Sequence, residues 1–106
     1  MVYVIKSVAE FEHYRTSEKY QTVVLMLSGK QCGPCRNITP FVERLSQQYT
    51  NILFLKAWND EVPQLFAGCR GMPSFLFFKS GKKVYEFAGA NNNQLNDAVR
   101  YCARSG

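Results

Sequence analysis

The stretch that decides the fold of this chain is Thr22-Val23-Val24-Leu25-Met26-Leu27-Ser28-Gly29-Lys30-Gln31-Cys32-Gly33-Pro34-Cys35-Arg36. Its opening run, Thr22 to Leu27, is apolar or β-branched and too short for a helix of its own, which predicts a buried central strand. After Ser28-Gly29-Lys30 come two cysteines separated by two residues, and a helical pattern follows them. The cysteine pair is therefore expected at the carboxyl end of a strand, where sites form in open α/β sheets.

The spacing of Cys32 and Cys35 predicts a redox-active dithiol. On the first turn of a helix the two side chains lie on one face, close enough to form a disulfide. Unpaired N–H groups and the positive end of the helix dipole stabilise a thiolate there. Cys32 is then the expected nucleophile, and Cys35 the protected thiol that resolves the mixed disulfide. Gly33 leaves the turn uncrowded, and Pro34 presets a helical φ where its missing N–H costs nothing.

The alternative for the same pair is half of a zinc site, which needs a second pair of ligands at suitable spacing. The remaining candidates, Cys69, Cys102 and His13, are isolated from one another in the sequence. We therefore expect no bound metal. For Cys69 and Cys102 a structural role is preferred over regulation by oxidation.

Length and composition limit the class of protein. The chain has 106 residues, 46% of them hydrophobic, which suits a single domain over residues 1–106. The start of the chain lacks a secretory signal, and no apolar run is long enough to cross a membrane, so we expect a cytoplasmic monomer without membrane contact. The formal charge of +5 is scattered from Lys6 to Arg104, which argues against a nucleic-acid partner.

Around the dithiol the chain alternates strands and helices. Residues 2–5 are apolar on both faces and predict a strand that helices cover on both sides. Ser7 and Glu10 form a capping box before the first helix. A long apolar stripe after Cys35 predicts a helix kinked at Pro40. Residues 51–57 then predict a buried strand, and residues 60–68 a short helix that ends at a glycine.

The last third of the chain changes pattern. Two strands, 74–79 and 82–88, are joined at Ser80-Gly81, the spacing of a tight hairpin, so they must be antiparallel. A final helix opens in the Asn91–Asn93 stretch, because asparagine is a good N-cap. It carries a buried stripe that includes Cys102.

With these elements in place, the chain resembles a thioredoxin over essentially its whole length. The motifs that carry the resemblance are Cys32-Gly33-Pro34-Cys35 after an apolar strand, Pro40 in the next helix, Met72-Pro73-Ser74 before the hairpin, and Phe87-Ala88-Gly89-Ala90-Asn91 before the last helix. A single Cys-x-x-Cys is a weak signal, whereas these motifs together and in register are a strong one. The opening Met1-Val2 and the Gly89-Ala90-Asn91 stretch are similar to cytosolic animal thioredoxins.

The resemblance implies a fold and an activity. The fold is an α/β thioredoxin fold, a five-stranded mixed β-sheet sandwiched between four α-helices. The activity is reduction of protein disulfides, with electrons from NADPH through a thioredoxin reductase and no bound cofactor beyond the Cys32–Cys35 disulfide. It also implies a cis Met72-Pro73 peptide packed against the dithiol, where a substrate chain can pair with Met72 as an added strand. The implied substrate groove consists of Gln31, Gly33, Pro34, Gly71, Met72, Pro73, Gly89 and Ala90.

The chain departs from the family pattern at three places. Gln31 stands where the family has a tryptophan before the first cysteine. Met26 stands where the family has a buried aspartate that accepts a proton from the second cysteine, and a thioether cannot do this. The segment 57–61 is about two residues shorter than the acidic loop of the family.

These departures keep a second function open, a thioredoxin-fold interaction module with little or no redox turnover. They also suggest two hypotheses about the surroundings of the dithiol. Trp58, the only tryptophan, follows a strand that ends at the same sheet edge and is expected to fill space vacated by the missing tryptophan; the alternative is an unrelated loop aromatic. Lys30, Arg36 and Arg70 are expected to form a basic rim that favours substrates with acidic flanks, against a groove indifferent to charge.

Overall fold

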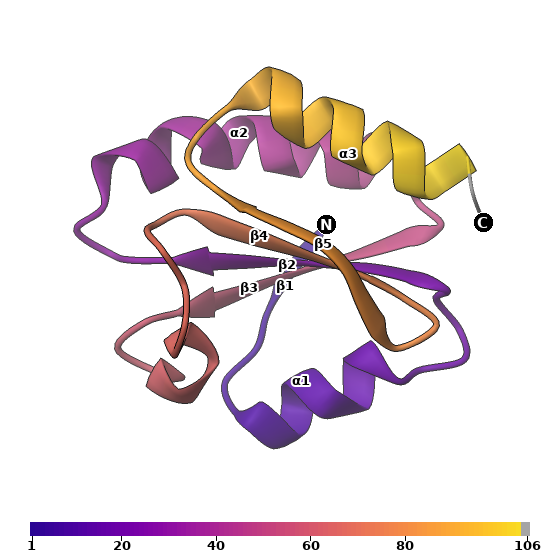
Figure 1. The fold of residues 1–106 in the computed structure, drawn as a ribbon, viewed down its shortest axis with the longest axis horizontal. Helices are drawn as coiled ribbons and strands as arrows, with labels where there is room; N and C mark the ends of the chain where they lie inside the picture. Colours follow the sequence, from indigo (N-terminus) through magenta and orange to yellow (C-terminus); the bar gives the residue numbers. More distant parts are fainter. Residues whose placement is uncertain (105–106) are drawn as a thin grey trace.

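The computed structural model describes residues 1–104, so residues 105 and 106 of the expected 1–106 domain lie outside the described residues. Five strands, three α-helices and one short 3-10 helix alternate along the chain (Figure 1). In chain order they are β1 Val2–Val4, α1 Val8–Arg15, β2 Thr22–Ser28, α2 Gly33–Gln48, β3 Ile52–Trp58, η1 Pro63–Phe66, β4 Ser74–Lys79, β5 Lys82–Ala88 and α3 Asn92–Arg104.

The strands form one mixed sheet in the order β1-β3-β2-β4-β5. The pairs β1–β3 and β2–β3 are parallel, whereas β4 pairs antiparallel with both β2 and β5. The strand predicted from Thr22 to Leu27 therefore lies at the centre, and every residue of β2 is buried. This agrees with a strand that helices cover on both faces.

Helices form a layer on each face of the sheet. In Figure 1 α2 and α3 lie together on one face, and α1 lies on the other with η1. The alternation of β2 divides the core accordingly: Val24 and Met26 pack on the α2 and α3 side, whereas Val23, Leu25 and Leu27 pack on the α1 side. The sandwich arrangement expected from the sequence is thus confirmed.

The prediction of a fourth α-helix, at residues 60–68, is wrong. Only Pro63–Phe66 is helical in the predicted 60–68 segment, and it forms a 3-10 turn. Pro63 has no N–H to donate, and Leu65 bonds to the carbonyl of Val62, three residues back. Gly68, with φ +91°, then turns the chain away. A segment this short between two breakers cannot reach the length of a stable α-helix.

Helices lie on both faces of the first strand, as predicted, but they cover it only in part: Val2 packs on the α2 side and Tyr3 on the α1 side. β1 lies at the edge of the sheet, where Tyr3 and Val4 are exposed. The ring of Tyr3 stacks on Tyr14 of α1, which covers part of one face. An apolar pattern alone does not distinguish this edge strand from a central one.

The predicted turn and cap signals behave as expected. The Ser7 hydroxyl accepts a bond from the Glu10 N–H at 3.0 Å, and the Asn91 side chain accepts one from the Gln94 N–H at 2.9 Å. The hairpin turn uses positive φ at Ser80 and Gly81. Pro40 lies inside α2, as predicted. None of the helices within residues 1–104 combines the length and the apolar character that crossing a membrane requires.

Candidate active site

The two cysteines of the central motif form a disulfide at the start of α2. Their Cα atoms lie 5.2 Å apart, a usual separation for a disulfide. β2 delivers the pair: it ends at Ser28, and the Cys32 N–H bonds back to the Gly29 carbonyl at 3.2 Å, which closes the turn between strand and helix. The site is therefore fixed by the most buried strand of the sheet.

The two sulfurs occupy different environments. Cys32 is the N-cap of α2 and is partly exposed, and its sulfur accepts a bond from the Cys35 N–H at 3.1 Å. Cys35 is 1% exposed and packs against Met26 and Ile38 in the core. An N-cap sulfur receives the free N–H groups of the first turn, which favour a thiolate. A protein substrate cannot reach the buried sulfur of Cys35.

The loop before β4 packs against the dithiol. The Met72–Pro73 peptide bond is cis, as the resemblance implied. The Met72 carbonyl oxygen lies 3.6 Å from the Cys32 sulfur. The Gly89 N–H donates to the Pro73 carbonyl at 2.8 Å, with Gly89 at a φ of +117° that favours glycine. This bond ties the start of the last loop to the cis-proline loop.

Some of the residues predicted for the substrate groove lie together around one hollow. Gln31, Cys32 and Met72 line one hollow of about 330 Å³. Gly33 and Pro34 form the first turn of α2 beside it. The carbonyl of Gly71 accepts a bond from Ser74, and Ala90 is exposed next to Gly89. The same hollow includes residues that the sequence reasoning missed, namely Gly29, Asn59 and Asp60.

Gly29 is the most informative of the missed residues. A Cβ built on it would lie 3.0 Å from the Met72 methyl carbon and 3.5 Å from the Cys32 Cβ. The 3.5 Å separation is an ordinary contact, whereas at 3.0 Å the tip of the Met72 side chain would have to move by a few tenths of an ångström. The signal in the sequence was a glycine between a buried strand and the cysteine motif.

The predicted basic rim is not assembled as expected. Lys30 forms ion pairs with Asp60 at 3.3 Å and with Glu61 at 3.1 Å, and the hydrogen bonds that its ammonium donates to Glu61 and Asp60 raise its pKa. Its charge is thus largely matched. Arg36 donates to the Lys30 carbonyl, whereas Arg70 lines a different hollow beside β5.

Trp58 lies behind the dithiol rather than in an unrelated loop. It lines a second hollow of about 330 Å³ together with Cys35 and Arg36. The ammonium groups of Lys30 and Lys56 lie 5.6 Å and 4.6 Å from the centre of its ring. The tryptophan therefore contributes to the surroundings of the buried cysteine.

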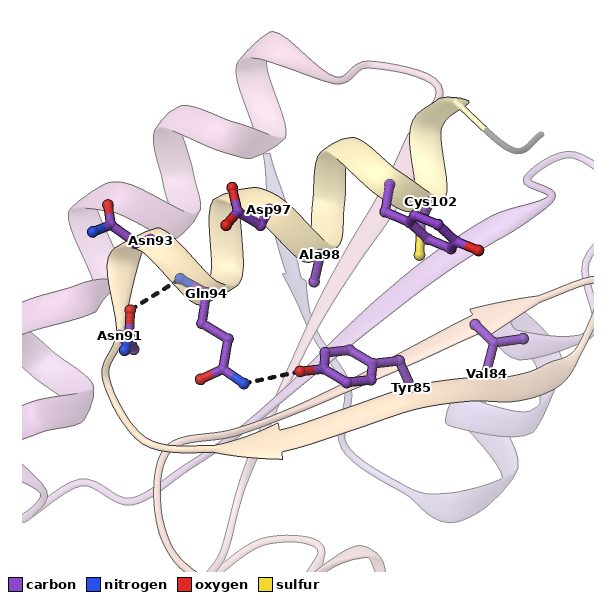
Figure 2. A pocket seen from close by; sticks show the side chains of 9 residues that line it. Val84, Tyr85, Asn91, Asn93, Gln94, Asp97, Ala98 and Cys102 are labelled. Carbon is purple, nitrogen blue, oxygen red and sulfur yellow. Dashed lines mark hydrogen bonds between the residues drawn. The ribbon is translucent and has the colours of Figure 1, made fainter.

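A larger hollow than these two lies between β5 and α3, with a volume of about 760 Å³ (Figure 2). Gln94 donates to the Tyr85 hydroxyl at 2.8 Å across it. Cys102 borders this hollow but is only 2% exposed, and burial raises the pKa of its thiol. A buried thiol with a raised pKa is a poor nucleophile, which agrees with the structural role predicted for Cys102.

No group of three or more metal-binding side chains occurs within residues 1–104.

The fold and the disulfide together define a class, the thiol–disulfide oxidoreductases built on the thioredoxin fold. The thioredoxin family model matches residues 2–101. The chain is 39% identical to thioredoxin of Equus caballus over 102 residues, covering 94% of this chain and 97% of the relative, and 38% identical to that of Homo sapiens over 101 residues, covering 93% and 96%. An X-ray structure of Fasciola hepatica thioredoxin superposes with a TM-score of 0.89 at 33% identity, covering 93% of this chain and 97% of the other.

The chain therefore belongs to the thioredoxin family. Its activity is that of a thiol–disulfide oxidoreductase, a protein-disulfide reductase that works through the Cys32–Cys35 pair.

Proposed function

We propose that Cys32 is the attacking thiol and Cys35 the resolving thiol in the reduction of protein disulfides. The observation that carries this assignment is the difference in environment: Cys32 is a partly exposed N-cap whose sulfur accepts the Cys35 N–H, whereas Cys35 is 1% exposed. The Cys32 thiolate attacks a substrate sulfur and releases the first substrate thiolate. The Cys35 thiolate then attacks the Cys32 sulfur, which releases the second substrate thiolate and leaves the Cys32–Cys35 disulfide.

We propose that the substrate chain binds across Gln31, Met72 and Gly89. The Met72 carbonyl near the Cys32 sulfur supports this placement, because an extended chain beside it can form backbone hydrogen bonds. The remaining groove residues are Gly33, Pro34, Gly71, Pro73 and Ala90. The ion pairs of Lys30 lessen the expected preference for acidic substrates.

We further propose that a thioredoxin reductase returns the disulfide to the dithiol with electrons from NADPH, in the cytoplasm. Membership of the family supports the reductase as partner. The departures at Gln31 and Met26 are expected to change rate and partner choice rather than the reaction.

Two measurements test the proposal. Brief alkylation of the reduced protein near neutral pH, followed by peptide mapping, should modify Cys32 before the other cysteines. Insulin reduction, first with dithiothreitol and then with a thioredoxin reductase and NADPH, should show turnover that Cys32→Ser abolishes. Preferential labelling of Cys35 would contradict the order of attack, and labelling of Cys32 without any insulin reduction would favour the interaction module.

A further inference from the structure

The hollow behind the dithiol is lined by two polar side chains that the reaction described above does not use. Besides Cys35 and Trp58, it is lined by Ser28 and Lys56, and it has a volume of about 330 Å³. This volume is large enough for several water molecules. Because Cys35 borders it, any charge or proton held there acts on the buried sulfur.

The sheet register explains why these side chains meet. Met26 pairs with Lys56, and Ser28 with Trp58, on neighbouring parallel strands. All of them lie on the sheet face that α2 covers, because side chains alternate along a strand and Met26 packs with the core on that side. Cys35, in the first turn of α2, closes the same space from above.

Two of the polar groups are poorly satisfied. Ser28 is 1% exposed, and within residues 1–104 its hydroxyl oxygen is the buried side-chain oxygen that has no hydrogen-bond partner. A buried hydroxyl without a partner destabilises the fold, because it has lost its hydrogen bonds to water. Such a group in a hollow of this size is a site for a bound water.

Lys56 is half-buried, and none of the described carboxylates lies within ion-pair distance of its ammonium. Desolvation lowers its pKa, and the charge of Glu43 on α2 opposes this effect. The ammonium lies over the face of the Trp58 ring, 4.6 Å from its centre. The ammonium is therefore a partly desolvated positive charge, and the lining of its hollow contains no carboxylate.

The other charged groups around the hollow do not fill this role. Lys30 is matched by Asp60 and Glu61, and Arg36 is exposed and donates to the Lys30 carbonyl. The remaining ionisable group in the lining is Cys35 itself. Its thiolate is the anion that forms during the second step of the reaction.

We propose that Lys56 is a positioning residue for the resolving step, and that its ammonium, through water held by the Ser28 hydroxyl, stabilises the Cys35 thiolate. In this step the Cys35 thiol loses its proton to the water of the hollow and thence to solvent. The thiolate attacks the Cys32 sulfur of the mixed disulfide, the bond from Cys32 to the substrate breaks, and the substrate thiolate leaves and takes a proton from solvent. Lys56 stays protonated throughout.

The inference rests on the proposed order of attack, so the experiment observes both steps at once. Reduced protein carrying Cys69→Ser is mixed with 5,5′-dithiobis(2-nitrobenzoate) in a stopped-flow instrument between pH 5 and 9. The first release of the coloured thiolate reports attack by Cys32 and depends on reagent concentration. The second release reports attack by Cys35, and its rate does not depend on reagent concentration.

Lys56→Gln should slow the second phase roughly tenfold at pH 7 and move the midpoint of its pH profile up by about one unit, since one pKa unit corresponds to a factor of ten. The first phase should change less than about twofold, because Cys32 takes its stabilisation from the α2 N-terminus. Lys56→Arg, which keeps the positive charge, should retain most of the second-phase rate. Ser28→Ala should slow the same phase by a smaller factor.

Lys82→Gln is the matched control, because it removes an equal charge from an exposed position on β5, and it should change neither phase. Equal shifts of both phases in Lys56→Gln, or loss of the second phase in Lys56→Arg as well, would overturn the role of Lys56. A first phase that survives Cys32→Ser would instead contradict the order of attack.

A second measurement keeps the inference testable if Lys56→Gln folds poorly. In a Cys32→Ser variant that also carries Cys69→Ser and Cys102→Ala, Cys35 is the one remaining cysteine, and the ultraviolet absorbance of its thiolate titrates it directly. Lys56→Arg should leave that titration in place, and Lys56→Met should raise its midpoint by about one unit. Identical midpoints in both variants would overturn the proposal.

Discussion

At the residue scale, the two active cysteines differ only in their position on one helix turn. Cys32 precedes α2 and receives an N–H bond, whereas Cys35 is enclosed by the core and by the hollow that Lys56 lines. The same side chain is therefore expected to ionise for different reasons at the two positions. The helix N-terminus acts on the first sulfur, and the water and ammonium behind the helix act on the second.

Gly29→Ala is expected to destabilise the site. The new methyl group would lie 3.0 Å from the Met72 methyl carbon and 3.2 Å from its sulfur. Overpacking costs about 1–3 kcal/mol, and we expect about 1 kcal/mol here because a methionine tip can move. Chemical denaturation should show this loss, together with slower insulin reduction. Combining it with Met72→Ala should remove the additional loss of stability; a cost that persists in the double variant would mean that Met72 is not the group displaced.

Trp58 is expected to report the redox state of the site. It lines the same hollow as Cys35, and the chain contains one tryptophan. Because a neighbouring disulfide quenches indole emission, the fluorescence should increase when dithiothreitol reduces the protein. Cys35→Ser, which cannot form the disulfide, should show no such change. An emission spectrum that is the same in both states of the parent chain would place Trp58 too far away to sense the sulfurs.

At the element scale, the periodic segments were predictable and the segments without a strong period were not. β2, α2, the β4–β5 hairpin and α3 were expected from continuous apolar runs, helical stripes and turn residues, and the structure contains them with small differences in bounds. The edge position of β1 depends on pairing with β3, which lies far away in sequence. The predicted helix at 60–68 is reduced to a 3-10 turn at Pro63–Phe66, because a glycine stop signals where a helix ends but not that too few residues precede it for an α-helix.

The cap of α3 provides a test at this scale. Asn91→Ala removes the oxygen that accepts the Gln94 N–H, so we expect a loss of about 1 kcal/mol in the free energy of unfolding. In a domain of about this size that lowers Tm by about 4–8 °C. Asn93→Ala is the control, since it makes a similar change inside the first turn of the same helix, where alanine is the better helix former. Equal losses in both variants would contradict the capping role.

At the scale of the whole molecule, the site depends on contacts that no local pattern contains. The motif at 32–35 was visible in the sequence, and the resemblance to a known family supplied the cis peptide bond at 72–73. The hollow behind the dithiol was not predicted, because its lining comes from β2, β3 and α2 and depends on the register that pairs Met26 with Lys56. Sequence reasoning identified Met26 as a missing acid but not the lysine beside it.

The charge that we assign to the resolving step has a cost for the fold as a whole. Desolvation lowers the pKa of Lys56 in the native state, so the unfolded chain binds more protons than the native chain between this lowered value and the ordinary value of about 10.4. The free energy of unfolding therefore rises with pH through that window. Below the window, at neutral pH, the full penalty is present.

Lys56→Met should remove this penalty while keeping the packing of the side-chain stem. We expect the variant to be more stable than the parent at pH 7 by on the order of 0.5 kcal/mol. The gain is small because Lys56 is only half-buried, and because the variant also loses the weak contact between the ammonium and the Trp58 ring. The gain should shrink as pH approaches about 10. Denaturant titrations of the oxidised proteins at both pH values measure it, with exposed Lys82→Met as the control that should show no such trend. A variant less stable than the parent at pH 7, or a difference that grows with pH, would mean that Lys56 stabilises the fold and that its charge is not held there at a cost.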